Sequence, residues 1–99
     1  MILTTTHTIE HHKIVDYLGI VTGVNMKMRD MTAFGSKTRQ AKDMEKALDE
    51  LKEESFQELR NNAKALGANA VVGIHIDFEP VGQGYYFGVS VTGTAVKVA

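Results

Sequence analysis

The spacing of hydrophobic positions predicts one long helix in the middle of the chain. From Thr38 to Leu66, apolar residues recur every three or four positions, the period of an amphipathic α-helix. The stripe comprises Met44, Ala47, Leu48, Leu51, Ser55, Leu59, Ala63 and Leu66, with Phe56 beside it. Gly67 follows where a left-handed C-terminal cap is expected. Such a helix is about 43 Å long, whereas a compact globule of this chain length has a radius of gyration of only ~13 Å. The helix therefore overhangs its own domain or packs partly against a neighbour.

Strand patterns lie on both sides of this helix. Residues 14–24 are rich in β-branched residues and apolar on both faces, so both sides of this strand should be covered. One face holds Ile14, Leu18, Ile20 and Val24. The other face holds Val15, Tyr17 and Val21. Residues 70–79 predict a strand in which an apolar run gives way to alternation of apolar and polar positions. A turn at 80–84 leads into another strand at 85–98. At the start of the chain, residues 1–6 could add a short strand.

Two local patterns refine this outline. Met28, Met31 and Phe34 recur at spacings of three within residues 25–34, which indicates a helical turn. In the last strand the apolar positions change parity after Gly93, which indicates a β-bulge at that glycine.

Together these elements predict an α+β domain of order β-β-α-β-β, in which one twisted sheet packs on the long helix. The helix forms a right-handed crossover between the strands before and after it, and the last two strands form an antiparallel hairpin. One helix covers only one face of a sheet. The positions that need another cover are Val15, Tyr17, Val21 and Val71. A second copy of the chain is the simplest source of that cover, so we expect a homo-oligomer of an order that this argument leaves open.

Composition and charge narrow the classes of protein to consider. The 99 residues suffice for a single domain, 1–99, and 43% hydrophobic with 23% charged residues is typical of a soluble globular protein. A formal net charge of −1 gives no attraction to nucleic acid or to anionic lipid. No apolar stretch reaches the ~20 residues of a membrane span, and the start, MILTTTHTIE, lacks the pattern of a signal peptide. We therefore expect a cytoplasmic protein with neither nucleic acid nor membrane as a partner.

A row of polar side chains is the first candidate metal site. His75, Asp77 and Glu79 all point to one side of their strand. Side chains at i and i+2 of a strand lie about 6.6 Å apart, so His75 and Asp77 can share one ion, whereas His75 and Glu79, at ~13 Å, cannot. A tetrahedral zinc site needs at least one further ligand. The alternative interpretation is a solvated or subunit-facing polar row that keeps the sheet soluble.

Three histidines near the start could supply the further ligand, as could a neighbouring subunit. His7, His11 and His12 fall in a polar loop, residues 7–13. The spacing of His7 and His11 would put two imidazoles on one face of a helix. The stretch has no helical pattern, however, and no H-E-x-x-H motif. A solvated loop is the alternative interpretation.

Methionine offers a soft-metal alternative, since the absence of cysteine excludes thiolate sites and disulfides. Met26, Met28 and Met31 form M-x-M-x-x-M, and thioethers suit Cu(I). Methionine is also a common filler of irregular apolar gaps, so packing in the core or at an interface is the competing interpretation.

Signals for catalysis or nucleotide binding are weak. The glycines Gly82, Gly84 and Gly88 lead into a strand and not into a helix N-terminus, so they mark a hairpin turn. No serine lies in a G-x-S-x-G context. An acid–base pair of His75 and Asp77 at a subunit boundary is the remaining enzymatic interpretation.

Three segments carry a family resemblance: KIVDYLGIVTG at 13–23, ALGANAVVGIHIDFE at 65–79 and VSVTGTAVKV at 89–98. Together they resemble the YbjQ-like family, small uncharacterised proteins often labelled as heavy-metal-binding. The resemblance spans nearly the whole chain and implies a subunit related to the dodecin-like fold and a ring-shaped homopentamer. Many members carry Gly-Gly-Arg-Ser before the long helix, whereas TAFGSKTRQAKD (32–43) replaces it here and looks several residues shorter. No activity of that loop is therefore carried over.

The sequence thus predicts a small homo-oligomer that binds a metal ion, such as a divalent transition metal, or a small ligand at subunit interfaces without catalysing a reaction. Two alternatives stay open. One is a structural or scaffolding oligomer with no ligand, and the other is an enzyme that acts at subunit junctions.

Overall fold

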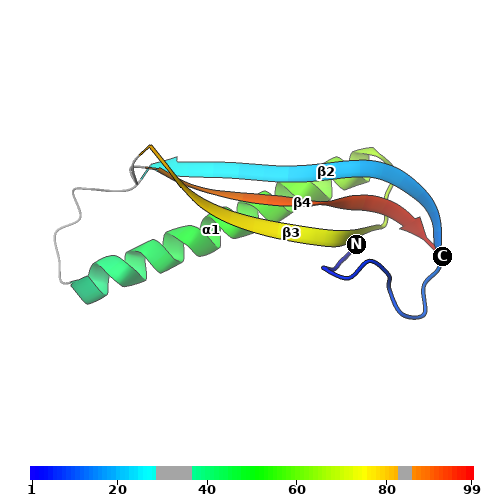
Figure 1. The fold of residues 1–99 in the computed structure, drawn as a ribbon, viewed down its shortest axis with the longest axis horizontal. Helices are drawn as coiled ribbons and strands as arrows, with labels where there is room; N and C mark the ends of the chain where they lie inside the picture. The colour runs from blue at the N-terminus through cyan, green and yellow to red at the C-terminus, as the bar shows by residue number, and fades with distance from the viewer. Residues whose placement is uncertain (29–36, 83–85) are drawn as a thin grey trace.

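The computed structural model describes residues 1–28, 37–82 and 86–99. One helix crosses one face of a four-stranded mixed sheet, and it passes behind that sheet in the view of Figure 1. The elements are β1 (Ile2–Leu3), β2 (Ile14–Met28), α1 (Lys37–Ala65), β3 (Ala70–Val81) and β4 (Tyr86–Val98). The predicted α+β class and β-β-α-β-β order are therefore confirmed.

The sheet has the strand order β1-β3-β4-β2, which makes β2 an edge strand. β3 and β4 form the predicted antiparallel hairpin, with Val81 opposite Tyr86 at its tip. β2 is also antiparallel to β4, so β2 and β3 run in the same direction on either side of it. The two-residue β1 pairs in parallel with the start of β3.

The long helix has nearly the predicted bounds and ends at the predicted cap. The Gly67 N–H donates to the Lys64 carbonyl at 2.9 Å, and the Ala68 N–H donates to the Ala63 carbonyl at 3.1 Å. The chain is elongated, with a radius of gyration of 16.4 Å and extents of 53 × 23 × 18 Å. In Figure 1 the N-terminal half of α1 diverges from the sheet, as the overhang argument predicted.

The core lies between the C-terminal half of α1 and the sheet. The helix contributes the fully buried Leu59 and Ala63, which pack on Val21, Val71, Ile74, Val91 and Ala95. Helix and strand approach closely at Gly23, where an added Cβ would overlap the Ser55 carbonyl group. Ser55 is itself fully buried and donates its hydroxyl to the Val89 carbonyl at 3.3 Å.

The helical turn predicted for residues 25–34 is wrong over its first part. Residues 25–28 belong to β2, which pairs with β4 as far as Met28 opposite Tyr86. A continuous ladder of hydrogen bonds to β4 outweighs a weak spacing signal in these residues. Met31 and Phe34 lie outside the described residues.

The β-bulge predicted in the last strand lies in its partner instead. β4 pairs without a shift against β2 from Tyr86 to Thr94, while the extra residue lies in β3 between Val72 and His75. Gly73 adopts φ +62° there, a left-handed conformation that glycine adopts at little cost. Opposite it, Gly93 leaves room for β3 side chains, since an added Cβ would lie 2.6 Å from Val71 Cγ1.

The change of parity in β4 has a different cause, namely a second apolar cover. Val96 and Val98 face away from the helix, where Ile9 and Ile14 pack over them in a small cluster with Ala70 and Val72. The N-terminal segment therefore covers the far side of the sheet near the chain ends.

In residues 1–28, 37–82 and 86–99 nothing else covers that side, and we call the sheet surface turned away from α1 the open face. Of the four residues predicted to need a second cover, two are exposed and two are buried. Val15 and Tyr17 are 56% and 69% exposed, but Val21 and Val71 are buried under the helix. β2 carries one extra residue near position 15 and another near position 18, where its pairing with β4 shifts. After each extra residue, the side chains that would have pointed to one face of the sheet point to the other.

Candidate functional site

Three adjacent rows of side chains make up the open face beyond the N-terminal cover. Alternation along each strand and pairing with β4 place all three rows on one side of the sheet. The β2 apolar row consists of the exposed side chains Tyr17, Ile20, Val24, Met26 and Met28. The β4 row is small and mostly hydroxylic, with Gly88, Ser90, Thr92 and Thr94. The β3 polar row is the predicted His75, Asp77 and Glu79.

Within the polar row, His75 and Asp77 form a pair. His75 Nε2 lies 3.2 Å from Asp77 Oδ1, and the two side chains are 74% and 53% exposed. Two atoms that each lie 2.0–2.1 Å from a tetrahedral Zn²⁺ are roughly 3.3–3.4 Å apart. The two atoms lie at hydrogen-bond distance, and the same separation would suit two ligands on one ion.

Glu79 extends the row but does not join the pair. It lies two residues beyond Asp77, opposite Gly88, so a strand places it about 13 Å from His75. The exclusion of Glu79 from the coordination shell of the pair stays a prediction from strand spacing.

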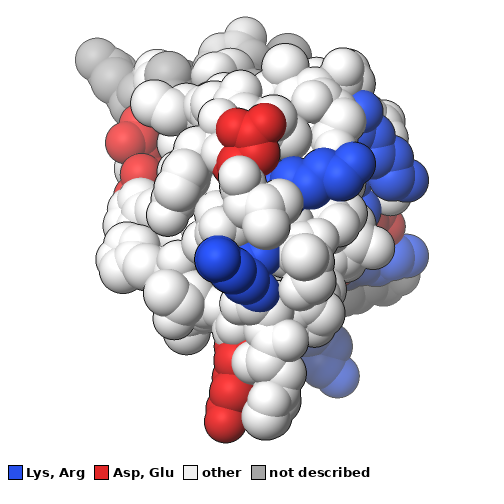
Figure 2. All heavy atoms as spheres, turned by 90° about the vertical axis from the view of Figure 1, so that its right-hand side faces the viewer, with Lys and Arg blue, Asp and Glu red and all other residues white. Residues whose placement is uncertain are grey.

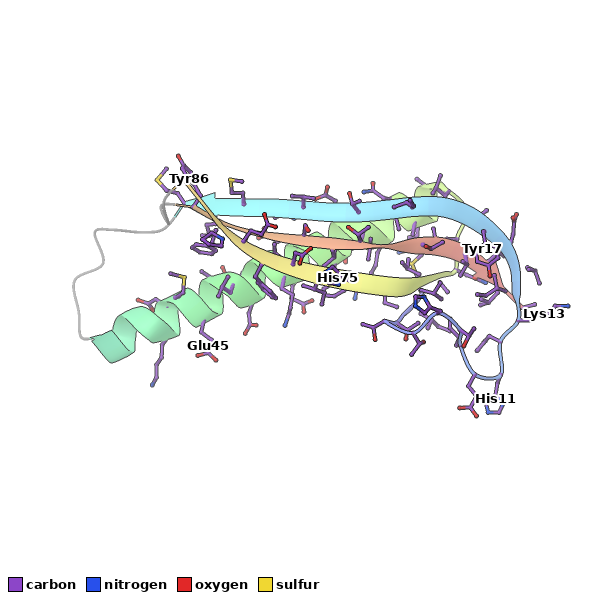
Figure 3. The ribbon with its side chains drawn as sticks, viewed as in Figure 1. His11, Lys13, Tyr17, Glu45, His75 and Tyr86 are labelled. Atoms are coloured by element: carbon purple, nitrogen blue, oxygen red, sulfur yellow. The ribbon has the colours of Figure 1, made fainter. Side chains whose placement is uncertain are left out.

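His11 and His12 lie in an exposed turn of the N-terminal loop. The His12 N–H donates to the Ile9 carbonyl at 3.1 Å, and His11 has φ 67°. His11 Nε2 lies 3.8 Å from Glu10 Oε1, with both side chains in solvent. Figure 3 shows His11 at the outer end of this loop, well separated from His75 on the sheet.

His7 lies at a different place, beside the bulge in β3. A Cβ built on Gly73 would meet His7 Nδ1 at 3.3 Å and Cε1 at 3.6 Å. Gly73 precedes His75 by only two residues. Of the three loop histidines, His7 is thus the one whose ring contacts the strand that carries the polar row.

Met26 and Met28 point to the open face from β2, with exposed fractions of 56% and 63%. Their row is separated from the β3 polar row by the width of β4, about 9.6 Å for two strand spacings. The thioethers and the His75–Asp77 pair therefore belong to different places on the sheet.

A metal site is incomplete within one described chain. Among residues 1–28, 37–82 and 86–99, no group of three or more His, Asp or Glu side chains lies close enough to hold one ion. The His75–Asp77 pair supplies two suitable donors, and a third has to be moved into place or come from another chain.

A small apolar cleft was missed by the sequence reasoning. It has a volume of about 230 Å³ and lies between α1 and the tip of the β3–β4 hairpin, lined by Met44, Leu48, Phe78, Glu79, Pro80, Tyr86, Phe87 and Gly88. The cleft lies where α1 diverges from the sheet (Figure 1). Because that arrangement joins residues far apart in the chain, no local sequence pattern indicates the cleft. Its volume is below the ~300 Å³ of ordinary ligand sites.

The surface near the chain ends carries both signs of charge. Figure 2 shows Lys and Arg side chains interspersed with Asp and Glu on this end of the molecule. Along the described parts of the chain, no helix is long and apolar enough to cross a membrane.

These features define a small α+β domain in which, among the described residues, one sheet face is covered and the other is open, the open face holding an apolar row and a two-donor polar row. The chain belongs to the YbjQ-like family, whose model, described as "Putative heavy-metal-binding", matches residues 1–99. That family is uncharacterised, and its description names a ligand class without naming a site.

Two comparisons with individual proteins agree with this assignment. The chain is 43% identical to a UPF0145 protein of Clostridium kluyveri over 108 aligned positions, which cover 99% of each chain. It also resembles the crystal structure of a protein of unknown function from Pediococcus pentosaceus, with a TM-score of 0.71 and 22% identity over 100% of this chain and 98% of that one. The second likeness supports the fold alone.

Proposed function

We propose that the protein is a self-assembling, non-enzymatic binding protein that takes up a divalent transition metal ion on the open face of its sheet. The observation that carries the proposal is the 3.2 Å His75–Asp77 pair, which lies on the same open face as the β2 apolar row. The assembly is a closed homo-oligomer, and the ring-shaped pentamer implied by the family resemblance is its expected form.

Self-assembly is supported by the exposure of the β2 apolar row. Its five side chains are between 55% and 78% exposed. Complete burial of a large apolar side chain contributes about 1.5–3 kcal/mol, so each member of the row would contribute roughly 1–2 kcal/mol on burial. The row also lies on β2, an edge strand of the sheet that the described residues form, and the outer backbone groups of an edge strand can pair with another chain.

The choice of metal follows from the donor atoms. An imidazole nitrogen with a carboxylate oxygen suits Zn²⁺, Ni²⁺ or Cu²⁺ better than a soft ion such as Cu(I). The exposure of both side chains also favours binding over catalysis. Acid–base pairs in enzymes are usually held in a desolvated cleft, whereas His75 and Asp77 face solvent.

Calorimetric titration with Zn²⁺, Ni²⁺ and Cu²⁺ tests the proposal. We expect saturable binding at one site per chain, strongly weakened in His75→Ala and in Asp77→Ala. The matched controls are His11→Ala and His12→Ala, which remove exposed imidazoles remote from the pair and should leave affinity unchanged. A flat titration of the unaltered protein with all three ions would refute metal binding.

A scaffolding oligomer without a ligand is the second candidate function. It is supported by the β2 apolar row alone, which needs no donor atoms to drive association. Metal titration and sedimentation together distinguish the two candidate functions. A scaffold predicts a stable oligomer that shows no heat of metal binding, whereas a metal-binding protein predicts saturable binding.

A further inference from the structure

We propose that His7 is the third ligand of the metal site, supplied by the same chain as His75 and Asp77. This inference rests on the proposed function, and it names the residue that completes the site. It begins from the bulge in β3, which brings the N-terminal segment against the strand immediately before the polar row.

Backbone hydrogen bonds hold that segment on the bulge. The Gly73 N–H donates to the Thr6 carbonyl at 2.8 Å, and the Ile74 N–H donates to the Thr4 carbonyl at 3.1 Å. These donors are available because the extra residue interrupts the regular ladder of β3. The residue after Thr6 is His7, so its position relative to β3 is set by main-chain contacts.

Side-chain hydrogen bonds brace the same segment from within. The hydroxyl groups of Thr4 and Thr6 lie 2.8 Å apart, and Thr6 Oγ1 donates to the Thr8 carbonyl at 2.6 Å. Such local bonds between hydroxyls and backbone stabilise a non-helical path. The backbone on both sides of His7 is therefore held, while its ring remains exposed to solvent.

The ring of His7 lies beside Gly73, two residues before the start of the polar row. It lies over Gly73, and the Cα atoms of Gly73 and His75 are at most roughly 7 Å apart, since two fully extended residues span no more. The space over Gly73 exists because glycine has no side chain, and a Cβ would lie 3.3 Å from His7 Nδ1. The proposal requires both exposed imidazoles to rotate toward an ion held by Asp77, with the His7 ring crossing from Gly73 toward His75.

The resulting set is two imidazoles and one carboxylate. This donor set suits tetrahedral Zn²⁺ with one position left for water or an outside ligand. The three side chains form no such set as they stand, since the described residues contain no group of three donors close enough to hold one ion. On this proposal, metal binding and the rotation of the two imidazoles occur together.

The test compares Zn²⁺ affinity across matched histidine variants. Loss of an outer-shell partner costs roughly 10–100-fold in metal affinity, so loss of a direct ligand in His7→Ala should cost at least about tenfold. His12→Ala should bind as the unaltered protein does. With Co²⁺ in place of Zn²⁺, the intense visible absorption of a tetrahedral site should weaken in His7→Ala and remain in His12→Ala.

The outcomes distinguish this inference from the proposed function. Unchanged Zn²⁺ binding in His7→Ala, with binding lost in His75→Ala, would overturn the role of His7 and leave the proposed function in place. If Zn²⁺ affinity is the same in every variant, or if the unaltered protein binds no Zn²⁺, both the role of His7 and the proposed function are overturned. Circular dichroism of each variant at equal concentration checks that the fold is retained.

A mixing experiment tests the origin of the ligands in one chain. The His7→Ala and His75→Ala proteins are unfolded, combined and refolded together. Same-chain ligation predicts that no sites are regained, because every chain then lacks one ligand. Recovery of tight Zn²⁺ sites in the mixture would mean that His7 and His75 come from different chains, and would overturn the proposal.

Discussion

The approach of α1 to the sheet at Gly23 offers a sharp test of the packing that positions the open face. Replacing Gly23 by alanine places a Cβ 2.9 Å from the Ser55 carbonyl carbon and 3.0 Å from the Leu59 backbone nitrogen, with its closest overlap on the Ser55 carbonyl oxygen. Each of these contacts is with helix backbone, which cannot rotate aside as a side chain can. We expect α1 to be displaced from β2.

The cost has two parts. Overpacking of a close-packed core costs about 1–3 kcal/mol. A displaced helix also strains the buried hydroxyl of Ser55, which donates to the Val89 carbonyl at 3.3 Å and accepts from Asn25 Nδ2 at 3.2 Å. Each such hydrogen bond contributes about 1 kcal/mol. We therefore expect Gly23→Ala to lose roughly 3 kcal/mol of unfolding free energy, a large share of the ~5–15 kcal/mol of a typical domain.

Urea unfolding followed by circular dichroism measures the loss, with Gly88→Ala as the matched control. A Cβ on Gly88 meets only ordinary contacts, at 3.6 Å to the Asn25 carbonyl and 4.0 Å to the Glu79 carbonyl. With a slope of about 1–3 kcal/mol per molar urea, Gly23→Ala should unfold roughly 1–3 M earlier than the unaltered protein. Gly88→Ala should be neutral or slightly stabilising. All samples need equal chain concentration, because assembly adds to apparent stability. Equal midpoints for the two variants would refute the reasoning.

Two further predictions concern the β2 apolar row. Ile20 is 78% exposed in the isolated chain, so Ile20→Lys should retain the fold but weaken assembly, seen as a smaller mass in sedimentation at micromolar concentration. The control is Gln57→Lys on the exposed side of α1, and a native-sized Ile20→Lys oligomer would argue against an interface at this row. Met28→Leu keeps the volume but removes the thioether, so it should leave assembly and Cu(I) uptake unchanged if methionine serves packing. A clear loss of Cu(I) uptake in Met28→Leu would reinstate the soft-metal interpretation.

Local periodicity was sufficient for the elements that carry their own pattern. The stripe from Met44 to Leu66 predicted α1 because a helix repeats its buried face every 3.6 residues whatever it packs against. Gly67 predicted the helix end because the cap is formed by bonds within a few residues. The shared direction of His75 and Asp77 followed in the same way from the two-residue period of a strand.

Tertiary structure decided every feature that depends on which strand pairs with which. The inserted residues in β2 exchanged its two faces, so Val21 became buried and Ile20 exposed, and no alternation within β2 reveals where an insertion falls. The same holds for the bulge at Gly73, because a bulge is a mismatch between two strands and the sequence of one strand cannot say which of them carries the extra residue. His7 lies beside Gly73 because Thr4 and Thr6 accept hydrogen bonds from that bulge, although His7 and Gly73 are 66 positions apart. The sequence by itself thus determined the helix, the strands and the donor pair, because these follow from short-range geometry. The open face and the surroundings of that pair arise from long-range pairing, which only the folded chain establishes.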